Sequence, residues 1–379
     1  MTIIADKIVS GGNSIGKING KTVFIPQLLP GEKAEVEIIE EKKDFSRASV
    51  KKIIEKSVHR KEPECRYYDI CGGCNLQIAD DDYQKELRLS ILIDSFTRSC
   101  RKYFENKPEL QKIIENAEII HDKDWNYRSR FQFHKGGLMR EGSSEIISID
   151  SCPVATDAVN SLIKEKKIDK KADKLFVFED VQAAQTDRRE KASSETSVVV
   201  KDKKLYFDVR GFFQSNLKML EKTLSLIETD IKQVKKRNCL LDMYSGVGTF
   251  SSFLGGLFDE CVLVEHNKNA LEYAGKNLQD LRFKTFAMSG EKWCSSKTAS
   301  TTDFDCIIID PPRSGMEKAV SSWICKKKIP HVFSVSCDPV THARDAALLI
   351  EAGYTLRKLV LLDFYPQTSH IESYAYFSI

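Results

Sequence analysis

Two side chains near the C-terminus have the chemistry needed for covalent catalysis. Cys337 follows an apolar run at residues 332–335, and Glu372 stands among strand-forming residues close to the end of the sequence. A thiolate adds to an electron-poor carbon, and a carboxylate then removes a proton so that the thiol leaves again. Cys337 is therefore a candidate nucleophile and Glu372 a candidate base. The structural alternatives are an inert buried cysteine and a surface glutamate in a salt bridge.

A glycine-rich turn supplies a candidate cofactor site. It spans residues 242–249 and includes Gly246, Gly248 and Thr249. Glycines let backbone amides approach a ligand closely, and ligands bind at the carboxyl ends of such strands. Glu265 ends the next predicted strand, where an acid accepts hydrogen bonds from ribose hydroxyls. The short G-x-G spacing favours S-adenosylmethionine over a dinucleotide, and the alternative is a structural turn beside a surface glutamate.

Two more motifs offer polar groups beside this turn. Asp310 ends another predicted strand, and Pro311 and Pro312 stiffen the loop that follows it. Gln214 stands among aromatic residues just before the α/β pattern begins, and it offers a side-chain amide. We expect both side chains to face the cofactor or the substrate.

Four cysteines have metal-binding spacing. The pattern C-x5-C-G-G-C holds Cys65, Cys71 and Cys74, and Cys152 precedes a proline much later. Four thiolates suit zinc or an iron–sulfur cluster. A zinc ribbon normally has two C-x2-C pairs and only one is present, so the spacing alone leaves the metal open. Most of the 11 cysteines should be reduced in a cytosolic chain.

The elements that position these residues alternate in type from about residue 215 onward. Strand patterns occur at residues 239–242, 261–265, 306–310, 331–336, 355–364 and 373–377, and helical patterns at 217–234, 270–278 and 343–349. Such alternation predicts an α/β domain built on a doubly wound, Rossmann-like sheet. The candidate residues then fall at the carboxyl ends of its strands.

The preceding residues predict two further domains. Residues 1–57 have short strand patterns and a hairpin signal at Asn19-Gly20, which indicate an OB-like β-barrel that binds nucleic acid or a protein. Residues 58–212 predict an α+β domain that carries the cysteines, with a helix over 80–103 and a strand at 130–134. Charged runs at 164–167 and 187–194 should be solvent-exposed. The third domain is then residues 213–379.

Composition excludes several classes of protein. The chain has 379 residues and a formal net charge of +3, so charge alone neither favours nor excludes nucleic acid. No apolar run reaches about 18 residues, so we expect no membrane span. The N-terminus lacks the pattern of a secretory signal, so we expect a cytoplasmic protein, and a monomer is the default expectation.

Taken together, the motifs resemble those of the RNA uracil-5-methyltransferases that act on bacterial 23S ribosomal RNA and on transfer RNA. The motifs that carry the resemblance are Phe213-Gln214-x-Asn216, the glycine-rich turn, Asp310-Pro-Pro-Arg313, Ser336-Cys337-x-Pro339 and Pro366-Gln367-Thr368-x-His370-Ile371-Glu372-Ser373. The N-terminal barrel resembles a TRAM domain through Gly16-Lys17, Phe24-Ile25-Pro26 and Leu29-Pro30-Gly31-Glu32. The resemblance runs almost from end to end.

This resemblance implies a role for each site residue. Cys337 would be the nucleophile that adds to the uracil ring, and Glu372 the base. The positions that match S-adenosylmethionine contacts are Gln214, Tyr244, Gly246, Thr249, Glu265 and Asp310. A [4Fe–4S] cluster would be held by Cys65, Cys71, Cys74 and Cys152, with zinc as the alternative. Arg313 and Arg344 are candidate partners for phosphate or for the enolate.

The chain departs from the family pattern in a few places. Ser245 replaces a common cysteine, Thr249 a common asparagine and Asp338 another asparagine. The segment 288–291 also lacks an acidic or amide side chain at the position expected near the adenine, although Glu291 ends it. No catalytic group is lost, and the departures bear on the expected contacts to the adenine.

The resemblance favours 23S ribosomal RNA over transfer RNA, because the transfer-RNA enzymes generally lack both the barrel and the cluster. A target base must leave its stack to be methylated at C5, so looped RNA is the expected substrate. Two alternatives belong to other classes: a non-catalytic RNA-binding protein on the same fold, and a methyltransferase for a small molecule. The presence of both Cys337 and Glu372 argues against the first, and the barrel argues against the second.

Overall fold

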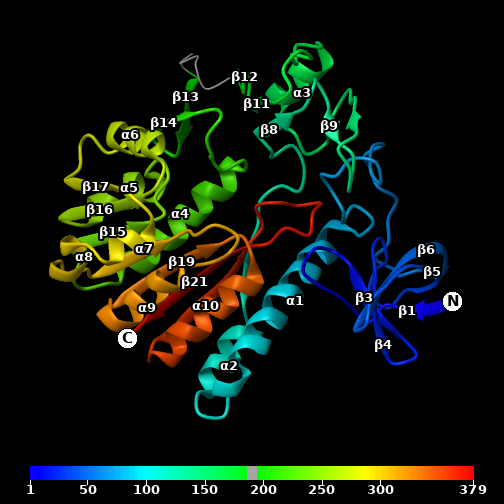
Figure 1. The fold of residues 1–379 in the computed structure, drawn as a ribbon, viewed down its shortest axis with the longest axis horizontal. Coiled ribbons are helices and arrows are strands. Elements are labelled where there is room, and N and C mark those ends of the chain that lie inside the picture. Colours follow the sequence, from blue (N-terminus) through cyan, green and yellow to red (C-terminus); the bar gives the residue numbers. More distant parts are fainter. Residues whose placement is uncertain (186–193) are drawn as a thin grey trace.

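The computed structural model describes residues 1–185 and 194–379. Figure 1 shows the ribbon coloured along the sequence, from the blue N-terminal strands to the red C-terminus. The charged run at 164–167 is exposed, as its composition predicts. The second charged run, at 187–194, lies outside the described residues apart from Ser194. Across the part of the chain that is described, no helix is both long enough and apolar enough to cross a membrane.

The N-terminal residues form a six-stranded sheet around a small aliphatic core. The strand order is β1-β5-β6-β4-β3-β2. The strands are β1 (Thr2–Ile4), β2 (Lys7–Ile8), β3 (Ser14–Ile18), β4 (Lys21–Ile25), β5 (Lys33–Glu41) and β6 (Phe45–Glu55). Asn19 and Gly20, which join β3 to β4, have φ angles of 51° and 79°. Positive φ at both residues is the hairpin geometry that an Asn-Gly pair predicts.

A long helix follows the cysteine-rich loop and packs on the C-terminal sheet. Helix α1 (Asp81–Cys100) begins where the Asp80 side chain accepts a hydrogen bond from the amide of Tyr83, close to the predicted start. It is followed by η1 (Arg101–Tyr103), α2 (Pro108–Glu115) and β7 (Glu118–Ile120). Helix α1 lies against α10 (Pro339–Glu351), and β7 pairs in parallel with β20 (Thr355–Leu362). Sequence patterns do not reveal this long-range packing.

Small antiparallel sheets make up the region from residue 130 to residue 208. Their elements are β8 (Arg130–Phe133), β9 (Leu138–Met139), β10 (Ile146–Ile147), α3 (Asp157–Lys164), β11 (Leu175–Phe178), β12 (Val181–Ala184), β13 (Glu195–Val200) and β14 (Lys203–Asp208). Strands β12, β11 and β8 form one sheet, and α3 packs on it because Val159 and Leu162 share a buried cluster with Phe131. Cys152 lies in the turn between β10 and α3, and this turn contacts the cysteine-rich loop where the hydroxyl of Tyr67 donates to Asp150 at 3.0 Å.

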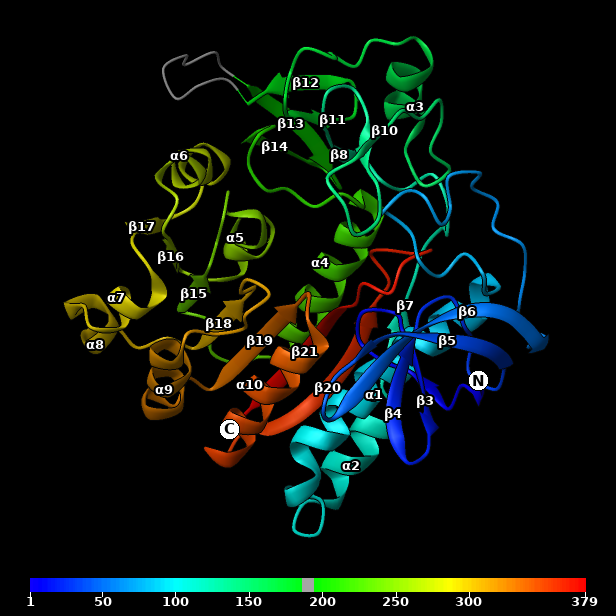
Figure 2. The ribbon, with the colours of Figure 1, turned by 45° about the vertical axis from the view of Figure 1, so that its right-hand side comes forward.

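The C-terminal sheet has eight strands in the order β17-β16-β15-β18-β19-β21-β20-β7 (Figure 2). Strands β17, β16, β15, β18 and β19 run parallel to one another, and β21 is antiparallel to both of its neighbours, β19 and β20. The new strands are β15 (Cys239–Met243), β16 (Glu260–Glu265), β17 (Phe283–Ala287), β18 (Cys306–Ile309), β19 (His331–Ser336) and β21 (Glu372–Ser378). The new helices are α4 (Leu217–Lys232), α5 (Thr249–Leu254), η2 (Gly255–Leu257), α6 (Lys268–Asn277), α7 (Gly290–Cys294), α8 (Lys297–Thr301) and α9 (Lys318–Lys327).

Helices cover both faces of this sheet, as the doubly wound prediction requires. Residues of α1, α9 and α10 share one buried core, and residues of α4, α5 and α6 share the other. The strands are buried from both sides, which explains their nearly continuous apolar runs. The parallel strands therefore present their carboxyl ends at one edge, where the candidate residues lie.

Candidate active site

The glycine-rich turn joins β15 to α5 through left-handed backbone. Tyr244, Gly246 and Gly248 have φ angles of 64°, 55° and 75°. Such angles are uncommon for a residue with a side chain, so Tyr244 is held in a constrained conformation. A Cβ atom placed on Gly246 would meet no atom within 4 Å. The turn thus has open space in front of its backbone, as a site for a bound ligand requires.

Glu265 connects this turn with the end of β16. Its carboxylate accepts hydrogen bonds from the amide of Gly246 at 3.1 Å and from the amide of Asn267 at 2.8 Å. The side chain is buried, and it is placed where acids that bind ribose lie in related sheets. The sequence-predicted neighbourhood of Gly246 and Glu265 is therefore present in the structure.

Two further acids line the same edge. Burial raises the pKa of Asp242 to about 7, although hydrogen bonds from the amide and hydroxyl of Ser251 favour the ionised form. Burial also raises the pKa of Asp310 to about 7, and the charge of Asp242 adds to the effect. Acids with pKa values raised this far cluster at functional sites.

Cys337 and Glu372 are neighbours because of the strand register. Strand β19 runs antiparallel to β21, and Ser336 lies opposite Ser373 at the last pair. The next residue after Ser336 is Cys337, and the residue before Ser373 is Glu372. Opposite residues of an antiparallel pair point to the same face with Cβ atoms about 5 Å apart. The thiol and the carboxylate therefore meet at this edge.

The surroundings favour the uncharged forms of both groups. Burial, reinforced by the charge of Asp310, raises the pKa of Glu372 well above its ordinary value. Burial raises the pKa of Cys337 to about 11, and the charges of Glu372 and Asp310 contribute. Arg313 acts in the opposite direction on both, so a cation also lies near the pair.

Two buried polar atoms of the predicted motifs have no partner in the described part of the chain, one in the glycine-rich turn and the other in the motif at residues 213–216. Within the described residues, neither the amide oxygen of Gln214 nor the hydroxyl of Ser245 has a hydrogen-bond partner. Unpaired buried polar atoms are unfavourable, and a polar ligand would satisfy them. These atoms fit the expectation that a cofactor binds beside the turn.

One residue near the site, Glu317, has no signal in the sequence. Glu317 accepts a hydrogen bond from the amide of Glu291 at 3.0 Å and lies 3.4 Å from the hydroxyl of Tyr244. It thus adds a second acid beside Glu291 and close to Tyr244. Arg344, by contrast, pairs with Asp345 at 2.7 Å and braces the loop after Pro312 through the carbonyl of Ser314.

The four predicted cysteine ligands come from two segments, and Cys65 lies near enough to the other three to affect their pKa values. All four are free thiols. Burial raises the pKa of Cys74 to about 12 and that of Cys152 to about 11, and the charge of Cys65 adds to both shifts. Burial likewise raises the pKa of Cys71, again with a contribution from Cys65. Among the described residues, however, no group of three or more His, Cys, Asp or Glu side chains is arranged to hold a metal ion.

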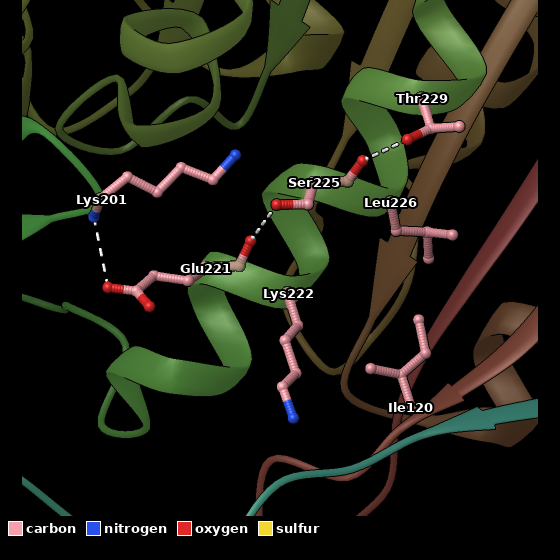
Figure 3. A pocket seen from close by; sticks show the side chains of 7 residues that line it. All are labelled: Ile120, Lys201, Glu221, Lys222, Ser225, Leu226 and Thr229. Carbon is pink, nitrogen blue, oxygen red and sulfur yellow. Dashed lines mark hydrogen bonds between the residues drawn. The ribbon is translucent and has the colours of Figure 1, made fainter.

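A separate hollow of about 520 Å³ lies away from these residues, between α4 and β7 (Figure 3). Its lining includes Lys201, Lys222 and Ile120. The amide of Lys201 donates to the Glu221 carboxylate at 3.2 Å, and the Lys222 ammonium pairs with Asp122 at 2.7 Å. The hollow contains no predicted site residue, so its presence does not bear on the chemistry above.

Comparisons with known proteins agree with this geometry. The model of the tRNA (Uracil-5-)-methyltransferase family matches residues 189–378, and the TRAM domain model matches residues 2–51. An uncharacterized RNA methyltransferase of Treponema denticola is 38% identical over 98% of this chain and 97% of its own.

Relatives with more specific names also match over nearly the whole chain. The 23S rRNA (uracil(1939)-C(5))-methyltransferase of Psychromonas ingrahamii is 30% identical, covering 99% of this chain and 95% of its own. The crystal structure of Pyrococcus abyssi tRNA (uracil-54, C5)-methyltransferase with S-adenosyl-L-homocysteine has a TM-score of 0.70. It covers 100% of both chains at 22% identity, which shows a shared fold. The chain therefore belongs to the tRNA (uracil-5-)-methyltransferase family of S-adenosylmethionine-dependent RNA (uracil-5-)-methyltransferases, with an N-terminal TRAM domain.

Proposed function

We propose that this enzyme methylates C5 of a uridine in 23S ribosomal RNA, with Cys337 as the nucleophile and Glu372 as the base. The observation that carries the proposal is the register of β19 and β21, which makes these two residues neighbours. Uracil C5 is a poor nucleophile by itself, so a thiol and a base at one edge are what the reaction needs.

In this mechanism the Cys337 thiolate adds to C6 and converts the ring to an enolate. S-adenosylmethionine, when bound, supplies the electrophilic methyl group for C5. The Glu372 carboxylate then takes the C5 proton, the C–H electron pair restores the C5–C6 double bond, and the C6–sulfur bond breaks. A carboxyl with a raised pKa is a stronger base once ionised, which suits this step. Arg313, whose charge acts on both side chains, would stabilise the enolate.

The cofactor would lie along the glycine-rich turn. Glu265 would accept hydrogen bonds from the ribose hydroxyls, and Gln214 would use its unpaired amide oxygen. The remaining contacts would come from Tyr244, Gly246, Thr249 and Asp310. The open space in front of Gly246 supports this placement.

We also propose that Cys65, Cys71, Cys74 and Cys152 hold a [4Fe–4S] cluster. The support is the donor set itself: four free thiols, with Cys65 close enough to the other three to affect their pKa values. Burial is the largest cause of the raised pKa values of Cys71, Cys74 and Cys152, the charge of Cys65 adds to each shift, and the charge of Arg128 acts in the opposite direction. A bound metal would stabilise the ionised forms. Methylation requires no electron transfer, so the cluster would be structural.

The metal assignment has a direct test. Protein purified without oxygen should be brown, absorb near 400 nm and contain iron and acid-labile sulfide. Cys74→Ser should lower the iron content, whereas Cys325→Ser, which replaces a thiol on α9, should not. A colourless preparation with stoichiometric zinc would establish the alternative metal.

The RNA substrate is proposed from the relatives and the domain content. Two relatives named as 23S rRNA (uracil(1939)-C(5))-methyltransferases match nearly the whole chain, at 28% and 30% identity. Transfer RNA is the second candidate, because the enzyme of known structure with the same fold acts on transfer RNA. In either case the uridine must be flipped out of its stack to reach the thiol.

A covalent trap tests reaction and substrate together. The full chain is incubated with S-adenosylmethionine and RNA that carries 5-fluorouridine, using 23S fragments and transfer RNA in parallel. Fluorine at C5 blocks the final proton removal, so the expected result is a stable protein–RNA adduct mapped to Cys337 on a 23S fragment. Cys337→Ala should form no adduct. An adduct on transfer RNA alone would reassign the substrate, and cofactor binding without any adduct would favour a non-catalytic protein.

A further inference from the structure

The loop that leads into Glu372 has an unusual backbone. Gln367, five residues before the proposed base, has a φ angle of 70° although it is not glycine. Side chains in this left-handed region are sterically unfavourable and persist only where the surroundings hold them. The Gln367 side chain is also completely buried. A buried, strained residue next to a catalytic group points to a positioning role.

Helix α1 holds this residue through a reciprocal pair of hydrogen bonds. The amide of Gln367 donates to the Oε1 atom of Gln84 at 2.9 Å. The Nε2 atom of Gln84 donates in return to the Oε1 atom of Gln367, also at 2.9 Å. Gln84 is only 1% exposed and also donates to the carbonyl of Ala79, so its orientation is set. Water cannot easily replace these bonds.

Every other polar group of Gln367 is bonded too. Its Nε2 atom donates to Asp81 at 2.9 Å, and its carbonyl accepts from the amides of Asn75 and Leu76 at 3.2 Å and 3.1 Å. The partners all come from the segment that follows Cys74 and from the start of α1. Figure 1 shows this arrangement, with the red C-terminal loop beside the upper end of the cyan helix α1.

The neighbours of Gln367 are held by the same region. Arg88 of α1 donates to the carbonyl of Thr368 at 3.2 Å and pairs with Asp363 at 2.9 Å inside the protein. Ser369 donates its amide to the side chain of Asn75 at 2.8 Å. The loop between Asp363 and Glu372 is therefore bonded along its length to a part of the chain about 280 residues earlier, since Gln84 and Gln367 are 283 positions apart.

We infer that Gln84 is a positioning residue for the base Glu372, an inference that rests on the proposed function. By holding the strained Gln367 peptide, Gln84 sets where the loop enters β21 and so where the carboxylate meets the C5 proton. The hydrogen bonds of the Gln84 side chain go to Ala79, Arg88 and Gln367 and not to the thiol or the glycine-rich turn, so we expect thiol addition and methyl transfer not to depend on it. The step it controls is proton removal from C5, with return of the C–H electron pair to the ring and loss of the C6–sulfur bond.

An effect of Gln84 on proton removal, but not on methyl transfer, predicts a specific kinetic signature. The substrate is transcribed 23S rRNA with tritium at C5 of its uridines, and the methyl group of S-adenosylmethionine carries carbon-14. In a single turnover, methyl incorporation is counted in all RNA, free and enzyme-linked, and tritium release reports proton removal. The two signals should coincide in the wild-type protein. In Gln84→Ala, the rate of tritium release should be about tenfold lower than the rate of methyl incorporation, as expected for the loss of two buried hydrogen bonds.

A matched control separates positioning from stability. Ser95 is a buried polar residue on the same helix, and its hydroxyl donates to the carbonyl of Ile91 rather than to the loop. Ser95→Ala should keep the two signals together. Gln84→Met keeps the length of the side chain but removes its hydrogen bonds. It should show the same slow tritium release, and it tests the inference if Gln84→Ala does not fold. Equal losses of methyl incorporation and tritium release in both Gln84 variants, with no lag, would overturn the inference.

Failure of the proposed function has a different signature in the same assay. Cys337→Ala should show neither methyl incorporation nor tritium release. Full activity of Cys337→Ala would refute the covalent mechanism itself, whatever the Gln84 variants do. The inference about Gln84 fails alone when Cys337→Ala is inactive and the two signals of the Gln84 variants still coincide.

Discussion

The buried imidazole of His342 lies 2.7 Å from the hydroxyl of Ser373, the residue that follows the proposed base Glu372. The same hydroxyl donates to the carbonyl of Ser336 at 3.4 Å, across the last register pair of β19 and β21. A hydroxyl has one proton to donate, so it accepts from the Nδ1–H of His342. This chain of bonds ties together the strand ends that present Cys337 and Glu372.

His342 should make the stability of the protein depend on pH. Its burial lowers the pKa to about 3, whereas the unfolded chain binds a proton near the ordinary value of 6.5. Stability is therefore present above pH 6.5 and lost as pH falls toward 3. Between pH 7 and pH 5 this group should account for a loss of about 2 kcal/mol in the free energy of unfolding. Urea unfolding of the wild type and of His342→Leu at both pH values measures it, and equal losses in the two proteins would contradict the assignment.

Glu372→Gln should stop the reaction after methyl transfer. The amide cannot take the C5 proton, so an enzyme-linked, methylated RNA should accumulate with ordinary uridine and no fluorine. Multiple turnover should fall by at least about 100-fold, the usual contribution of a general base. Denaturing gels of radiolabelled RNA would show the adduct. Glu351→Gln, at an exposed position of α10, is the control, and normal turnover in Glu372→Gln would exclude it as the base.

The thiol of Cys337 should become more reactive as pH rises. Its pKa is raised to about 11, first by burial and then by the charges of Glu372 and Asp310. The thiolate fraction, and with it the rate of alkylation by iodoacetamide, should increase about tenfold per pH unit between pH 7 and pH 9. Mass spectrometry of the peptide that contains Cys337 measures this rate in the free enzyme. A rate that levels off below pH 9 would show that the free thiol is already activated.

Glu265→Ala should weaken cofactor binding. The substitution removes the carboxylate that would accept hydrogen bonds from the ribose. It also removes the hydrogen bonds that the amides of Gly246 and Asn267 donate to this carboxylate, which shape the turn. The dissociation constant for S-adenosylmethionine should rise about 10- to 100-fold, as expected for charged hydrogen bonds. Isothermal titration calorimetry provides the measurement. Glu260→Ala, at the other end of the same strand, should leave the affinity unchanged, and an equal effect of both changes would place the ribose elsewhere.

The sequence by itself determined most of the elements after residue 215 and where the motif residues stand on them, although β17, α7, α8 and α9 were not predicted. The predicted strands and helices after residue 215 correspond to β15, β16, β18 to β21, α4, α6 and α10, because the apolar periodicity of each segment is a local property. The turn at Asn19-Gly20 follows equally from local backbone preferences. The motif residues then lie at the strand ends, since parallel strands in such a sheet end at one edge.

Only the tertiary structure decided how distant segments support the site. The packing of α1 on α10, the addition of β7 to β20 and the bonds between Gln84 and Gln367 join parts of the chain that no local pattern relates. The roles of Glu317 and His342 became visible in the same way, through their neighbours. A side chain's periodicity reports whether it is buried, whereas its partner depends on how whole elements pack together. The residues that hold the catalytic loop in place therefore had to be read from the fold.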